Sequence, residues 1–95
     1  MPKFESKDGK LFIDGKRVIK AWESFNGWYW FAVEKIQTQD SIMSDGSIAE
    51  NDTIWFGFVQ GLEEEWGDFS QAEIESLGAR AWRIPEKNLP YSGRR

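Results

Sequence analysis

Short apolar runs alternate with turn signals in the first third of the chain, a pattern typical of β-strands. Asp14-Gly15, a dipeptide favoured in two-residue hairpin turns, separates two such runs, and Asn26-Gly27 separates the next two. We therefore predict three or four antiparallel strands within residues 10–35. The simple register of the first hairpin pairs Ile13 with Lys16, Phe12 with Arg17 and Leu11 with Val18.

Two of the predicted strands are apolar on both faces. In residues 28–33, Trp28, Trp30 and Ala32 alternate with three further apolar residues, and residues 54–59 show the same property. Strands of this kind belong in the middle of a sheet whose two faces are both covered. One short helix covers only one face, so the other face needs the rest of the chain or a partner.

A short helix is predicted to begin after Ser70. The Ser70 side chain can accept a hydrogen bond from the Glu73 amide, and the Glu73 side chain can reach back to the Ser70 amide, which forms a capping box. Phe69 and Ile74 have the spacing of a hydrophobic staple, and Gly78 supplies a left-handed stop. A helix of about two turns is not stable alone, so it must pack on an apolar surface.

These elements predict an α+β fold: a small twisted antiparallel sheet of about five or six strands, with one short helix near residues 71–77 packed on it. The 95 residues form a single domain (1–95), in which residues 1–8 and 87–95 are expected to be loosely ordered. Residues 36–52 read as a long polar connection with few apolar anchors. A connection of this length is either functional or mobile.

The absence of His and Cys excludes Ser-His, Cys-His and imidazole- or thiolate-ligated metal chemistry. Glu34, Asp52 and Glu65 could meet as a carboxylate group for acid-base work or a Mg²⁺ site, which is the reading of a metal-dependent hydrolase. We favour solvated or arginine-paired charges at strand ends instead. Calcium binding by the acids of residues 40–52 is a further alternative, but a flexible acidic loop is favoured. We therefore predict no enzyme, no catalytic residue, no metal and no cofactor.

The net charge of −4 conceals a strong separation of charge. Residues 36–78 contain ten acidic residues and no basic residue, whereas the segments on either side are net positive. Concentrated negative potential steers basic partners and can imitate the phosphates of a duplex. It also repels nucleic acid, which makes nucleic-acid binding an unfavoured interpretation. Glu73 and Glu75 are explained by the helix, so the candidate partner-binding residues are Asp40, Asp45, Glu50, Asp52, Glu63, Glu64, Glu65 and Asp68.

Self-association is the alternative hypothesis. If one sheet face stays uncovered, its aromatic side chains could join two copies of the chain as a homodimer, or attach it to an assembly as a structural subunit. The aromatic interface candidates are Trp30 and Trp55.

Three motifs resemble a family of small uncharacterised bacterial domains carried on plasmids and other mobile elements. They are the Trp-rich strand 28–34, Asp-Thr-Ile-Trp-Phe-Gly-Phe (52–58) and Glu-Trp-Gly-Asp-Phe-Ser-Gln-Ala-Glu-Ile (65–74). The stretch from the first motif to the last, over which the resemblance extends, is about half of the chain. The chain departs from the family at Asp68, where the family more often has an aromatic residue. The resemblance implies a fold and a mobile-element setting without a mechanism. It fits an inhibitor or accessory factor from a phage or plasmid that acts on a basic, nucleic-acid-handling protein.

The N-terminal residues lack the apolar run of a signal peptide, and no stretch of about 18 apolar residues could cross a membrane. The lack of Cys fits a reducing compartment. We therefore expect a soluble cytoplasmic protein with no membrane partner.

Overall fold

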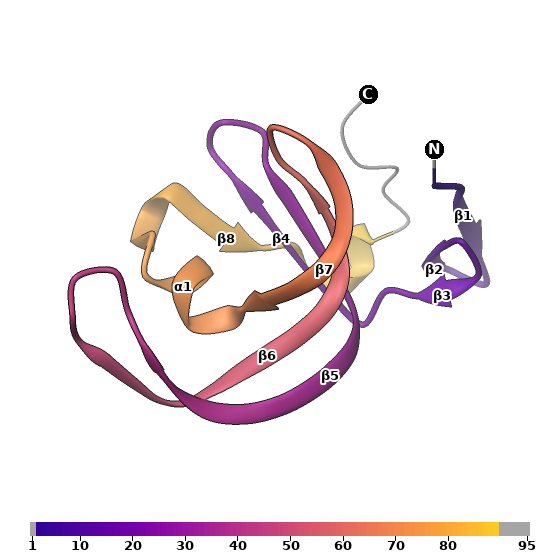
Figure 1. Ribbon diagram of the computed structural model, residues 1–95. Coiled ribbons are helices and arrows are strands. Elements are labelled where there is room, and N and C mark those ends of the chain that lie inside the picture. The colour runs from indigo at the N-terminus through magenta and orange to yellow at the C-terminus, as the bar shows by residue number, and fades with distance from the viewer. Residues whose placement is uncertain (1, 90–95) are drawn as a thin grey trace.

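Eight strands in two antiparallel sheets account for most of the computed structural model, which describes residues 2–89 (Figure 1). The first sheet has the order β1-β2-β3 and the second has the order β7-β6-β5-β4-β8. The strands of the first sheet are β1 (Phe4–Lys7), β2 (Lys10–Ile13) and β3 (Lys16–Arg17). Those of the second are β4 (Lys20–Ser24), β5 (Tyr29–Ile42), β6 (Ile48–Gln60), β7 (Glu64–Ser70) and β8 (Ala81–Arg83). The helical elements are α1 (Gln71–Glu75), η1 (Gly78–Arg80) and η2 (Glu86–Asn88).

The predicted antiparallel sheet with one short α-helix is confirmed, but the proportions differ from the prediction. The helix has five residues, and the strands divide into sheets of three and five, so the fold is closer to all-β than to α+β. The N-cap of the helix is as predicted, since Ser70 Oγ accepts a hydrogen bond from the Glu73 amide at 3.1 Å. The helix ends earlier than predicted, at Glu75 with Ser76 as its C-cap, and Gly78, the predicted stop, begins η1 with a φ of 61°.

The first hairpin has the predicted register. Ile13 lies opposite Lys16 and Phe12 opposite Arg17, and the Val18 amide donates to the Leu11 carbonyl at 2.9 Å. The segment 1–8, expected to be loosely ordered, contains β1, which pairs along its whole length with β2. In the segment 87–95, Asn88 ends η2 and Leu89 is buried, while residues 90–95 lie outside the described residues.

The reading of residues 36–52 as a long connection is wrong. Strands β5 and β6 continue through this segment as one long hairpin, and only residues 43–47 form the turn. Most side chains in the far half of the hairpin are polar and exposed, so this half shows no alternation of the kind that reveals a half-buried strand. Three register shifts in the pairing of β5 with β6 further blur the pattern.

The β5–β6 ribbon is strongly curved and wraps around α1, as Figure 1 shows. Gly57 permits a close approach of the two strands, because a Cβ added there would lie 1.9 Å from the carbonyl oxygen of Phe31 on β5. Only glycine, which has no Cβ, therefore fits at position 57 without a shift of the β5 backbone.

The two faces of the ribbon bury different sets of apolar residues, as the two-sided pattern of β5 and β6 predicts. One core lies between the two sheets and contains Leu11, Ile13, Val18, Ala21, Tyr29, Phe31, Phe58, Ile84 and Leu89. The other lies under α1 and contains Trp22, Ala32, Trp55 and Ile74, with Trp30, Phe69 and Ala81 packed against it. The N-terminal sheet thus covers the face that the helix leaves open. No helix within residues 2–89 has the length and apolarity needed to span a membrane.

Candidate binding groove

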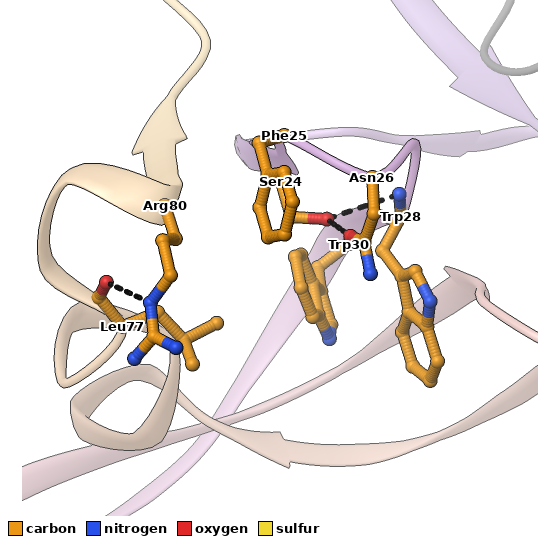
Figure 2. Close-up of a pocket in the computed structure, with 7 residues that line it drawn as sticks. All are labelled: Ser24, Phe25, Asn26, Trp28, Trp30, Leu77 and Arg80. Atoms are coloured by element: carbon orange, nitrogen blue, oxygen red, sulfur yellow. Dashed lines mark hydrogen bonds between the residues drawn. The ribbon is translucent and has the colours of Figure 1, made fainter.

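A groove of about 430 Å³ opens on the α1 side of the five-stranded sheet, between the β4–β5 turn and the segment that follows the helix (Figure 2). Three aromatic side chains and one aliphatic side chain contribute its apolar surface. Its lining residues are Ser24, Phe25, Asn26, Trp28, Trp30, Leu77 and Arg80. The groove therefore joins residues that are more than fifty positions apart in the sequence.

Ser24 holds the turn that forms one wall of the groove. Its hydroxyl donates to Oδ1 of Asn26 and accepts from the Trp28 amide at 3.1 Å, and Figure 2 shows both bonds. The buried hydroxyl is thereby satisfied within the turn. The turn then carries Phe25 outwards, and 68% of this residue is exposed. An apolar side chain held in water by a hydrogen-bonded turn is a candidate contact residue.

Trp28 and Trp30 lie side by side in the groove, with ring centroids 5.8 Å apart and planes inclined by 34°. The ring of Trp28 lies directly against Gly61, where an added Cβ would come within 2.4 Å of a ring carbon. Gly61 is therefore the support that sets the position of the Trp28 ring. Trp30 is half-buried because its ring also packs against the core under α1.

Leu77 and Arg80 form the opposite wall. The Arg80 Nε donates to the Leu77 carbonyl at 3.2 Å, which leaves the two terminal nitrogens of the guanidinium for other partners. Two smaller hollows continue from the groove, and Leu77 lines both of them. One, of about 270 Å³, runs along α1 past Phe69 and Ile74, and the other, of about 240 Å³, reaches the β5–β6 turn at residues 43–47.

The lining of the groove combines aromatic rings with polar side chains, including those of Asn26 and Arg80. Aromatic rings offer a large apolar contact area with little conformational freedom to lose, while the Asn26 amide and the Arg80 guanidinium can orient a polar group. A predominantly apolar concave surface with a few converging polar groups is the usual form of a ligand site. Among the described residues that line the groove there is no Asp or Glu.

Asp52, one of the predicted partner-binding residues, serves the fold instead. It is only 4% exposed, and its carboxylate accepts hydrogen bonds from Ser41 Oγ at 2.7 Å, from the Ala72 amide at 2.8 Å and from Ser70 Oγ. Burial raises the pKa of Asp52, but these hydrogen bonds outweigh the effect and hold the pKa below its usual value. Asp52 thus joins the β5–β6 hairpin to the start of α1.

The other predicted acids do not form one surface. Asp40, Asp45 and Glu50 lie on the far half of the β5–β6 hairpin, whereas the Glu63–Glu65 run lies at the β6–β7 turn, at the opposite end of β6 (Figure 1). Asp40 accepts a bond from the Asn51 amide at 3.1 Å. Asp45 accepts from the Ser47 hydroxyl and amide, and these bonds lower the pKa of Asp45. Asp68 lies on β7, beyond the Glu63–Glu65 run.

The carboxylates considered for a hydrolase are also separated. Glu34 lies opposite Phe56, while Asp52 and the residue opposite Glu65, Val59, lie seven positions apart on β6. Seven positions correspond to roughly 20 Å in an extended strand. Within residues 2–89 no group of three or more carboxylates is placed to hold a metal ion.

The two aromatic interface candidates have different positions. Trp30 lines the groove, but Trp55 is only 6% exposed, and its indole N–H donates to the Gln71 side chain at 2.9 Å. Trp55 is therefore a core residue and does not lie on an uncovered face. Sequence reasoning missed Phe25 and Arg80. The available signal for Phe25 was its position just before the Asn26-Gly27 turn, where an apolar side chain has no core to enter.

A scan against protein-family models finds no match to this chain, and searches of curated proteins and of solved structures find none either. The family resemblance of the three sequence motifs stays a prediction.

Proposed function

We propose that the chain is a non-enzymatic protein-binding module, and that it holds a segment of its partner in the groove beside Phe25, Trp28 and Trp30. The observation that carries this proposal is the 68% exposure of Phe25 at the edge of an aromatic groove of about 430 Å³. That volume lies within the range of about 300–1,000 Å³ typical of ligand sites. Covering a large apolar side chain contributes about 1.5–3 kcal/mol, which favours an occupied groove.

The lining residues also indicate what the bound segment contains. A large apolar or aromatic side chain would lie against Trp28 and Trp30, where offset or edge-to-face ring contacts are available. Arg80 would pair with a carboxylate of the segment through its terminal guanidinium nitrogens, because an arginine fork suits a carboxylate. A segment with an aromatic residue close to an Asp or Glu, or to a free carboxyl end, meets both requirements.

A displayed peptide library selected on the purified chain tests this. We expect selected peptides to combine an aromatic residue with an acid, and Phe25→Ala to weaken their binding by about tenfold, as the loss of one buried aromatic contact predicts. Arg80→Gln should weaken the same peptides by about fivefold at low salt. The affinities are measured by fluorescence anisotropy of labelled peptides.

The matched control is Leu62→Ala, which removes an apolar side chain that is 93% exposed and lies at the β6–β7 turn, outside the groove. Its affinity should equal that of the unaltered chain. Selected peptides that bind Phe25→Ala and the unaltered chain equally well would contradict the proposal. So would a library that yields no saturable binder.

Self-association is the second candidate function. Ile42 and Ile48 lie directly opposite each other at the end of the β5–β6 hairpin, and both are exposed, which leaves an apolar tip outside either core. A second copy could cover this tip. Sedimentation equilibrium over a wide concentration range decides the matter: a dimer that Ile42→Ser dissolves would support self-association, and a monomer at every concentration would contradict it.

A further inference from the structure

Strand β7 is an edge strand of the five-stranded sheet. It pairs with β6 on one side, and no other strand of residues 2–89 pairs with its outer side (Figure 1). It is seven residues long, contains no proline and pairs with β6 without a register shift. An open edge of this length is a template for one more strand.

The register shows which backbone groups of β7 face outwards. The Gly61 amide donates to the Glu63 carbonyl at 3.0 Å, so these two residues form a directly hydrogen-bonded pair at the start of the ladder. Directly bonded and non-bonded pairs alternate in an antiparallel ladder. The residues that bond to β6 are therefore Glu65, Gly67 and Phe69. The N–H and C=O groups of Trp66 and Asp68 face the open edge.

Acidic side chains lie on either side of one aromatic ring along this edge. Trp66 and Asp68 share a sheet face with Glu64, and Glu65 lies on the other face. The Trp66 ring stacks on Phe56, with centroids 5.8 Å apart, and stays half-buried. No basic side chain of residues 2–89 forms an ion pair with Glu65 or Asp68. The order along the edge is acid, aromatic, acid.

We propose that β7 takes up an extended basic segment of a partner protein as an additional antiparallel strand. Backbone hydrogen bonds from Trp66 and Asp68 would hold the segment, as in other cases of strand addition. A lysine or arginine side chain of the segment would lie opposite Asp68, and an apolar side chain two positions away would cover Trp66. A second copy of this chain does not suit the edge, because pairing β7 with β7 brings like charges together. None of the described residues that line the groove belongs to β7, although the hollow that continues along α1 passes Phe69 at the end of this strand.

Acidic residues on an edge strand can also act solely to prevent aggregation. That role and strand addition make different predictions. If the charges only keep other strands away, a basic peptide gains nothing from its backbone N–H groups. If the edge is a docking site, those N–H groups are required.

The probe is a seven-residue peptide in which a central valine has a lysine two positions away on each side, with threonine at the other positions. Its N-methylated form, blocked at the amides that would pair with β7, and a form with glutamate in place of lysine are the controls. We expect the N-methylated peptide to bind about tenfold more weakly, since it loses two or more backbone hydrogen bonds. The glutamate form should not bind. In the complex, the amides of Trp66 and Asp68 should exchange their hydrogens more slowly.

Asp68→Pro removes an outward N–H without disturbing the bonds to β6, a substitution that edge strands tolerate. It should bind the lysine peptide more weakly than Asp68→Asn, which removes only the charge, while Glu50→Gln on the distant hairpin should bind normally. Phe25→Ala should also bind the lysine peptide normally. This result distinguishes a failure of the β7 proposal from a failure of the proposed groove function. Equal binding of the N-methylated and unmodified peptides to the unaltered chain would overturn the proposal, and that comparison does not depend on any variant folding. The absence of saturable binding at low salt would overturn it as well.

Discussion

Replacement of Asp52 by alanine should lower the free energy of unfolding more than replacement of any other acidic residue within residues 36–78. The Asp52 carboxylate is the common acceptor for Ser41, Ser70 and Ala72, which belong to β5, the end of β7 and α1. Removal of this carboxylate leaves the Ala72 amide and the two hydroxyl groups without their acceptor. Asp52 is only 4% exposed, so water does not easily replace it. One substitution thus loosens three elements at once.

The expected loss follows from those bonds. Hydrogen bonds to a charged group contribute about 1.5–3 kcal/mol each, but bonds that share one acceptor are not additive, so we expect a total of about 3 kcal/mol. For a domain of this size, each kcal/mol corresponds to about 4–8 °C, so the melting temperature should fall by about 12–24 °C. Asp40→Ala is the matched control, because the exposed Asp40 accepts one bond from the Asn51 amide. Its loss should be below about 1 kcal/mol.

The effect should also depend on pH with a defined sign. The pKa of Asp52 is lower in the folded chain than in the unfolded chain, where it is about 3.9. Its ionised form therefore stabilises the fold above that value, and this contribution disappears as the pH falls through the lower, folded pKa. The stability difference between the unaltered chain and Asp52→Asn should be largest near neutral pH and should shrink below about pH 4.

Denaturant unfolding followed by tryptophan fluorescence and by far-ultraviolet circular dichroism measures both effects. Coincident transitions would justify a two-state analysis of each variant. A loss for Asp52→Ala no larger than that for Asp40→Ala would refute the structural role of Asp52. A difference between Asp52→Asn and the unaltered chain that grows as the pH falls would refute the pKa argument.

Three further substitutions test how the ribbon and the groove are built. Gly57→Ala should cost about 4 kcal/mol or more, because its Cβ would meet the Phe31 carbonyl oxygen at 1.9 Å; circular dichroism should show an unfolded chain or a much lower melting temperature. Gly61→Ala should displace the Trp28 ring from its support, so the Trp28 indole signal should shift in nitrogen–proton spectra while the fold persists. Ile42→Ser should leave the melting temperature within about 2 °C of the original value, since Ile42 is 78% exposed; a larger fall would mean that the hairpin end is packed.

The parts of the fold that the sequence predicts are those governed by local rules. The Asp14-Gly15 turn sets the first register, and the spacing of Ser70 and Glu73 locates the start of the helix, because both depend on neighbouring residues. Residues 28–33 are apolar on both faces, and this pattern also identifies the strand that lies between the two cores. These signals need no knowledge of distant parts of the chain.

The parts that escape prediction depend on distant pairing. Mostly polar side chains conceal the far half of the β5–β6 hairpin, because a strand without apolar alternation cannot be told from a loop. The acids of residues 36–78 lie in one segment of the sequence. In the structure they lie in two groups, because β6 carries the chain from one end of the sheet to the other. The groove has the same cause: Phe25 and Arg80 meet only because β8 pairs with β4, and the Phe25 amide donates to the Arg80 carbonyl.

The indole N–H signals of the six tryptophans provide the most direct test of the proposed binding groove. A peptide selected from the library is added to nitrogen-15-labelled protein, and the six signals are assigned by single Trp→Phe variants. We predict that the signals of Trp28 and Trp30 move in a saturable manner, while that of Trp55, whose N–H is bonded to Gln71 in the core, stays in place. Saturable binding that leaves the Trp28 and Trp30 signals unchanged would contradict the account.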